Sequence, residues 1–241
     1  NPVLEINNFV GDNIYAPNDG SLIFLNRSFH VLFRSTQGSS PKPYAPDIYP
    51  VNKLSWLTDG GFVAGNNQGA TYVDSQGKHY VLNGYLNSQV NYSLAPSGAI
   101  AYLANKSLVF KESLLNSISL VVENLDVVNH QVLLSPDAKY ILLYSGIVCV
   151  DLEEKECSEL KDKTKNIIFD SVTRSKLAEI PNDRVIDNAL WGPDGKLAYT
   201  NGTNAHIYDL NTKENFDLAT TVNNTPVWVL GFADKNSIFY A

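Results

Sequence analysis

The stretch "GPDGKLAYT", residues 192–200, decides the fold because it joins a tight turn directly to a strand. Its proline presets φ at the first corner, its aspartate can hydrogen-bond to its own backbone, and its second glycine accepts a positive φ. Leu197 and Tyr199 then alternate with other residues, which is the period of a half-buried strand. If the same turn and strand recur along the chain, they mark one copy of a repeat.

The pattern does recur, as two mostly apolar residues, a small residue, a turn and a strand. Its copies are "IYAPNDGSLIFL" from Ile14, "WLTDGGFVAG" from Trp56, "SLAPSGAIAYL" from Ser93, "LLSPDAKYILLY" from Leu133, "LWGPDGKLAYT" from Leu190 and "GFADKNSIFYA" from Gly231. The small residues of successive copies lie 42, 37, 40, 57 and 41 positions apart. A period near 40 residues with strands throughout is typical of propeller blades.

The repeat also continues into a third and an outer strand, most clearly in "ATYVDSQGKHYVLNG" after Gly69 and "HIYDLNTKENFDLAT" after Ala205. We therefore predict an all-β protein: a single β-propeller domain over residues 1–241, with six blades of about four strands. The predicted blades span about residues 8–48, 49–86, 87–126, 127–182, 183–222 and 223–241, the last together with 1–7.

The long spacing before the fifth copy has a local explanation. Two hairpin-like segments, residues 147–160 and 167–180, stand where one is expected. We predict an inserted hairpin near residues 146–160, at a blade edge. Cys149 and Cys157 lie in it and come close enough on paired strands to form a disulfide, which would stabilise a small hairpin. Two reduced thiols are the alternative.

The last copy ends after its second strand. Residues 2–6 are similar to the outer strands of other copies, so we expect this N-terminal strand to close the last blade. A third strand is then missing, and this incomplete blade is a candidate site for self-assembly or for strand addition from a protein partner. The alternative is a shortened chain. The chain has no Met, and we expect it to be a piece of a longer protein.

The repeat resembles a known group of propeller repeats. Residues 190–220, "LWGPDGKLAYTNGTNAHIYDLNTKENFDLAT", are similar to the TolB-like and WD-like repeats of many bacterial envelope proteins. The shared features are a Trp, a small residue, Pro-Asp-Gly-Lys, an apolar strand and an "IY-D" third strand. The resemblance implies a propeller that binds proteins, peptides or glycans, or that accompanies a catalytic domain. A fold of this kind does not define the function.

Composition narrows the partners and the location. A net charge of −7 argues against a nucleic-acid surface, and no apolar run approaches the length of about 18 residues that crosses a membrane. Five N-x-S/T sequons exceed the chance expectation and, with the cysteine pair, favour an extracellular or cell-envelope protein. The candidate glycosylation sites are Asn26, Asn105, Asn201 and Asn223, whereas the fifth sequon, Asn91, has a competing interpretation.

That interpretation is a ring of polar residues around the propeller channel. In four consecutive blades the inner strand starts with a β-branched residue, and the residue that follows it is polar. In the last blade a Trp occupies the equivalent position. The candidate ligand-binding residues are Asn52, Asn91, Asn129, Asp187 and Trp228. A glycan on Asn91 would exclude a channel position. The alternative is that each polar side chain caps the loop that enters its own strand.

No catalytic constellation is visible in the sequence. The four His lack zinc-ligand spacing, and the chain has neither a nucleophile elbow nor a phosphate-binding glycine loop. We therefore expect no metal, no cofactor and no catalysis by this chain.

Three functions remain open. The one we favour is a non-catalytic extracytoplasmic module for recognition or assembly on a cell surface. The second is the propeller domain of a larger enzyme such as a peptidase, which a nucleophile elbow beyond residue 241 would favour. The third is a cytosolic WD-like scaffold, which reduced cysteines and unmodified sequons would favour.

Overall fold

The computed structural model describes a set of strands and the turns that join them, and it divides into two compact units. The described residues are 11–15, 21–26, 31–36, 40, 42–44, 51, 53–66, 69–82, 92–104, 106–116, 120–122, 125, 131–144, 165–180, 186, 188–201, 204–220, 229–234 and 237–240. Unit 1 comprises residues 1–90 and 96–98, and unit 2 comprises 91–95 and 99–241. The prediction of a single domain therefore stays a prediction.

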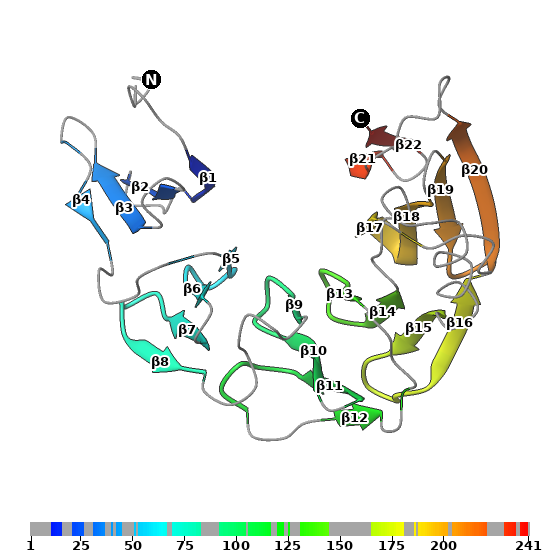
Figure 1. Cartoon of the computed structure of the whole chain (residues 1–241), viewed down its shortest axis with the longest axis horizontal. Coiled ribbons are helices and arrows are strands. Elements are labelled where there is room, and N and C mark those ends of the chain that lie inside the picture. The colour runs from blue at the N-terminus through cyan, green and yellow to red at the C-terminus, as the bar shows by residue number, and fades with distance from the viewer. Residues whose placement is uncertain are drawn as a thin grey trace, which may run out of the picture. The chain divides into compact units, whose positions relative to one another are not determined.

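Unit 1 contains two four-stranded antiparallel sheets, in each of which the strands follow chain order (Figure 1). The first sheet consists of β1 (Gly11–Tyr15), β2 (Ser21–Asn26), β3 (Val31–Thr36) and β4 (Lys42–Pro43). The second consists of β5 (Lys53–Trp56), β6 (Phe62–Asn66), β7 (Gly69–Val73) and β8 (His79–Val81). Trp56 packs against Phe62 in this second sheet, with ring centroids 5.1 Å apart.

Unit 2 contains three four-stranded sheets and a two-stranded sheet in its described part, all antiparallel. They are β9 (Tyr92–Leu94), β10 (Ile100–Ala104), β11 (Ser107–Lys111) and β12 (Leu120–Val122); β13 (Gln131–Leu134), β14 (Tyr140–Tyr144), β15 (Asn166–Asp170) and β16 (Lys176–Ile180); β17 (Asn188–Trp191), β18 (Lys196–Thr200), β19 (Asn204–Asp209) and β20 (Glu214–Thr220); and β21 (Val229–Asp234) with β22 (Ser237–Tyr240). Four antiparallel strands in chain order are the blade that the repeat predicts.

The two predicted special features, the inserted hairpin of the fourth repeat and the closing strand of the sixth, lie outside the described residues. β14 pairs directly with β15, and the predicted inserted hairpin near residues 146–160 lies in the segment between them, which is not described. The predicted closing strand, residues 2–6, is also outside the described residues. Both predictions therefore stay predictions. In the described part of the chain, no helix has the length and apolar character that a membrane crossing needs.

The turns between the first and second strands of the blades follow the predicted chemistry. Gly60 and Gly195 have φ of 84° and 74°, the left-handed region that glycine enters most readily. Ala138 takes the same position in the β13–β14 turn with φ of 60°. The predicted reversal at residues 193–195 is confirmed as a tight turn in which both Asp194 and Gly195 have positive φ, and a 2.8 Å hydrogen bond from Gly192 N to Lys196 O closes the hairpin behind it.

The second strand β18 is buried on both faces, so the half-buried prediction for residues 196–200 is wrong. Leu197 packs in a cluster with Leu142 and Trp191, while its neighbour Ala198 packs in a different cluster with Val229. Both side chains are fully buried. An alternating pattern predicts one solvated face, but a sheet with another sheet stacked on each side buries both.

Candidate functional site

The sequence-predicted site residues lie almost entirely outside the described residues. This holds for all five candidates of the channel ring, Asn52, Asn91, Asn129, Asp187 and Trp228, and for Cys149, Cys157, Asn105 and Asn223. The ring, the disulfide and these glycosylation sites stay predictions. Two sequons fall in described segments: Asn26 ends β2, and the Oδ1 atom of Asn201 lies 3.0 Å from Nε2 of His206. Neither observation tests glycosylation.

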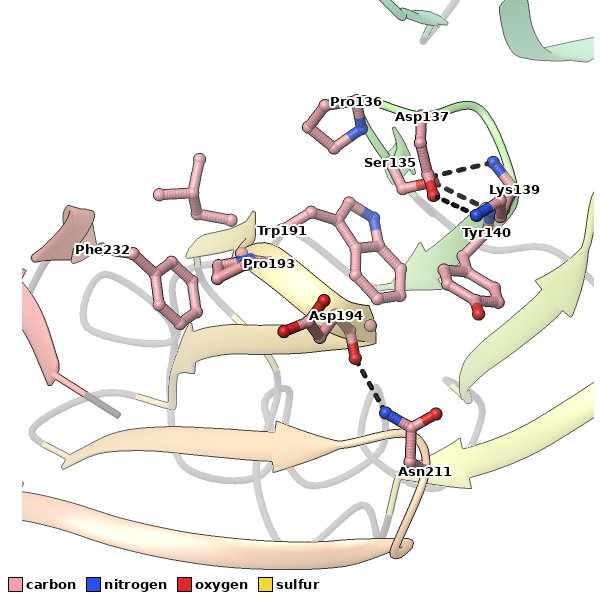
Figure 2. Close-up of a pocket in the computed structure, with 13 residues that line it drawn as sticks. Ser135, Pro136, Asp137, Lys139, Tyr140, Trp191, Pro193, Asp194, Asn211 and Phe232 are labelled. Atoms are coloured by element: carbon pink, nitrogen blue, oxygen red, sulfur yellow. Dashed lines mark hydrogen bonds and ion pairs between the residues drawn. The ribbon is translucent and has the colours of Figure 1, made fainter. Parts of the chain in front are cut away.

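The described residues form a different candidate site, a pocket of about 690 Å³ in unit 2 (Figure 2). Two equivalent turns supply most of it, the β13–β14 turn and the β17–β18 turn, and β21 and the β19–β20 turn complete it. The lining residues are Ser135, Pro136, Asp137, Lys139, Tyr140, Leu190, Trp191, Gly192, Pro193, Asp194, Gly195, Asn211 and Phe232. The two turns are the two copies that match the Pro-Asp pattern best.

Aromatic side chains from three strands build the apolar part of the pocket. Figure 2 shows the Trp191 ring between the two turns. Trp191 is 5% exposed, its Nε1–H donates to the Leu133 carbonyl at 3.1 Å, and its ring lies 5.7 Å from that of Tyr140. Trp191 thus packs between two sheets, because Leu133 belongs to the preceding sheet.

Gly192 lets the third aromatic residue approach. A Cβ atom at this position would lie 2.5 Å from ring atoms of Phe232, closer than non-bonded carbons come. The equivalent residue of the preceding turn is Ser135. The glycine therefore does two things: it makes room for the Phe232 ring in the pocket, and it removes a hydroxyl group from the turn.

In the β13–β14 turn the polar groups bind one another. Ser135 Oγ donates to Asp137 Oδ1 at 2.7 Å and accepts from Tyr140 N at 2.9 Å. The ammonium of Lys139 lies 3.2 Å from Asp137 Oδ2, and its backbone N–H also donates to this carboxylate. Burial opposes ionisation of Asp137, but the hydrogen bonds from Ser135 and Lys139 outweigh it and lower its pKa. This carboxylate is occupied in holding the turn.

In the β17–β18 turn the equivalent aspartate has no such role. Asp194 has φ of 58° and ψ of 33°, the left-handed region, and is exposed. No described residue pairs with its carboxylate, because Gly192 cannot offer the hydroxyl that Ser135 offers to Asp137. Its backbone carbonyl accepts a 2.8 Å hydrogen bond from Asn211 Nδ2, drawn in Figure 2.

Asn211 is positioned by the aspartate that ends β19. Asp209 Oδ1 accepts from the backbone N–H of Asn211 at 2.9 Å and, more weakly, from that of Thr212 at 3.5 Å. The Lys196 ammonium lies 3.4 Å from Asp209 Oδ2. Burial opposes ionisation of Asp209, but these hydrogen bonds and the lysine charge together lower its pKa. The amide nitrogen of Asn211 is held by Asp194, so its Oδ1 is a further acceptor at the pocket.

The pocket was not predictable as a site from the repeat alone. Sequence reasoning assigned both Pro-Asp turns to the blade frame, which is correct for their backbone. The signal that could have pointed to a site is the difference between "SPDA" and "GPDG" at equivalent positions. Among the described residues no group of three His, Cys, Asp or Glu side chains could hold a metal.

Comparison with known proteins identifies the fold. No family model matches the chain, and no curated protein matches its sequence. Solved structures do match. Hsv2 of Kluyveromyces lactis is 12% identical with a TM-score of 0.61, over 92% of this chain and 74% of that one. Virginiamycin B lyase from Staphylococcus aureus is 12% identical with a TM-score of 0.58, over 93% and 75%. A chain of a nidogen/laminin complex is 9% identical with a TM-score of 0.53, over 89% and 81%.

These neighbours are β-propellers. This chain has a β-propeller fold. The fold class predicted from the repeat is thereby confirmed, but the likeness does not single out TolB-like or WD-like repeats. At these identities it establishes the fold alone.

Proposed function

We propose that this propeller is a non-catalytic recognition module that binds a partner polypeptide in the pocket between the two Pro-Asp turns. The observation that carries the proposal is the pocket itself: about 690 Å³, with aromatic walls and with polar groups that have no partner among the described residues. Such a combination of apolar surface and a few convergent polar groups is typical of binding sites. One of the propellers that this chain resembles is solved within a nidogen/laminin complex, which supports a protein partner.

An enzyme is the second candidate. Virginiamycin B lyase, a structural neighbour, is a propeller named for a catalytic activity. The side chains of the described pocket argue against an enzyme. Several of them make hydrogen bonds within the turns. None of the described ones forms a nucleophile–base pair with a third group that orients the base, as acyl transfer requires. Kinship with TolB-like or WD-like repeats is also a proposal, supported by residues 190–220.

We place the protein outside the cytoplasm, in the extracellular space or the cell envelope. The support is the pair Cys149 and Cys157 in one predicted hairpin and the number of sequons. Peptide mapping of native protein without reduction should recover the two cysteines in one linked peptide, and some sequon peptides should carry glycan mass. Two free thiols together with unmodified sequons would place the protein in a reducing compartment instead.

The binding proposal is tested by NMR on the isotope-labelled protein. The probes are blocked tripeptides, acetyl-Gly-X-Gly-amide, in which X is Arg, Glu, Leu, Tyr or Ser. We expect at least one class to shift the indole N–H of Trp191 and the side-chain amide of Asn211 saturably. The indole of Trp56, in unit 1, serves as the internal control and should not move. If no probe shifts the two pocket signals at millimolar concentration, the pocket is not a peptide site.

A further inference from the structure

We infer that the pocket takes a basic side chain of the partner, an arginine in preference to a lysine, with Asp194 as its counter-ion. This inference rests on the proposed function and adds the chemistry of the ligand. It follows from which charges and hydrogen-bonding groups of the pocket are already engaged within the chain.

The charges of the pocket do not cancel. Two carboxylates and one ammonium line it, those of Asp137, Asp194 and Lys139. The Lys139 ammonium pairs with Asp137, whose carboxylate also serves the turn. The Asp194 carboxylate therefore has no charge partner among the described residues. A cation is the group that balances it, and a charge-assisted hydrogen bond to a carboxylate is among the stronger polar contacts.

Three side-chain donors of the pocket are engaged within the chain, whereas two acceptors are left over. Trp191 Nε1–H donates to Leu133 O, Asn211 Nδ2 donates to Asp194 O, and Ser135 Oγ donates to Asp137. The Asp194 carboxylate and Asn211 Oδ1 are acceptors with no described partner. A ligand rich in donors fits this set, whereas a carboxylate or phosphate would meet an uncompensated negative charge.

The walls suit a cation carried on an apolar stem. Phe232, Pro193 and Trp191 present ring surface beside Asp194 (Figure 2). A methylene stem can pack on such a surface, and an aromatic face attracts a cation in addition. Arginine is favoured because its planar guanidinium stacks on flat rings, is weakly hydrated and offers several donors to separate acceptors. The chain's net charge of −7 attracts basic partners at longer range.

The test compares two probes of the same shape and different charge, acetyl-Gly-Arg-Gly-amide and acetyl-Gly-citrulline-Gly-amide. Citrulline replaces the guanidinium by a neutral urea. In the wild-type protein the arginine peptide should shift the Trp191 and Asn211 signals with an affinity about tenfold higher than the citrulline peptide, the range expected for one charge-assisted hydrogen bond. The lysine peptide should bind between the two.

Two variants make the test specific. Asp194→Asn removes the charge but keeps the shape, and asparagine tolerates the left-handed conformation of this position, so the turn should persist. It should weaken the arginine peptide about tenfold and leave the citrulline peptide unchanged. Glu112→Gln changes the net charge equally at an exposed residue outside the pocket lining, and its affinity should match that of the wild type.

The outcomes separate this inference from the proposed function. If both peptides shift the pocket signals equally and Asp194→Asn binds as the wild type does, the pocket is a peptide site but its charge preference is refuted. If Asp194→Asn and Glu112→Gln weaken the arginine peptide to the same extent, the attraction comes from net charge and Asp194 is not the counter-ion. If another peptide class shifts these signals and the arginine peptide does not, the proposed function stands and the ligand class is wrong.

Discussion

Replacing Leu142 by alanine and replacing Leu143 by alanine should destabilise the protein to a similar extent, by about 2–5 kcal/mol each. The two residues are neighbours on β14 and point to opposite faces of its sheet. Leu142 is 0% exposed and packs with Ile168 and Leu197, whereas Leu143 is 2% exposed and packs in the cluster that contains Leu134. Each substitution leaves a cavity in a different core, so the losses should be nearly additive in the double variant.

Urea denaturation followed by fluorescence gives the free energies of unfolding. Val172→Ala is the control, because Val172 is 66% exposed and surface substitutions change stability by about 0.5 kcal/mol or less. A large loss for one leucine and none for the other would mean that β14 has a solvated face, and the stacking of sheets on both of its sides would be wrong.

Trp191→Ala should reduce the free energy of unfolding by about 3–5 kcal/mol, because it removes a large buried side chain that contacts two sheets of unit 2. The indole fills the space beside Tyr140 and Leu142 and bonds to Leu133 O. Trp191→Phe keeps most of the volume but leaves that carbonyl without its donor, which should cost about 1–3 kcal/mol. The same urea titrations measure both values.

The pair of variants separates packing from hydrogen bonding. If Trp191→Phe is as stable as the wild type, the bond to Leu133 contributes nothing and packing alone holds the indole. If Trp191→Ala is also tolerated, neighbouring sheets do not depend on this contact. Neither variant can report on ligand affinity through the indole signal, so Asn211 serves as the reporter for both.

The sequence predicted the blade well because its determinants are local. The turn at residues 193–195 and the hairpin formed by β19 and β20 follow from proline, glycine and aspartate at fixed offsets and from period-two strands. The burial of β18 was predicted wrongly because that prediction also used only local sequence pattern. A period-two pattern contains no information about a second sheet that covers the opposite face, which is a property of the assembled sheets.

The candidate site was not predictable because it depends on contacts between distant parts of the chain. Gly192 and Phe232 are 40 positions apart and meet only in the fold. Asn211 reaches the Asp194 carbonyl from the next hairpin. The channel ring was predicted from equivalent positions in the repeat, a criterion that selects what the copies share. The pocket arises where two copies differ.

The contrast between Asp137 and Asp194 bears on how a repeated architecture acquires specificity. A chain built by internal duplication starts with the same residue performing the same structural task in every copy. One copy can retain that task, here through the hydrogen bond from Ser135 to Asp137. In a neighbouring copy, glycine replaces the serine and the equivalent aspartate lacks this hydrogen bond. The backbone of the second turn differs from that of the first, because Asp194 as well as Gly195 has positive φ, and the Asn211 amide bonds to the Asp194 carbonyl. Repetition of the turn can thus make a side chain available for binding in one copy, and no new loop is needed.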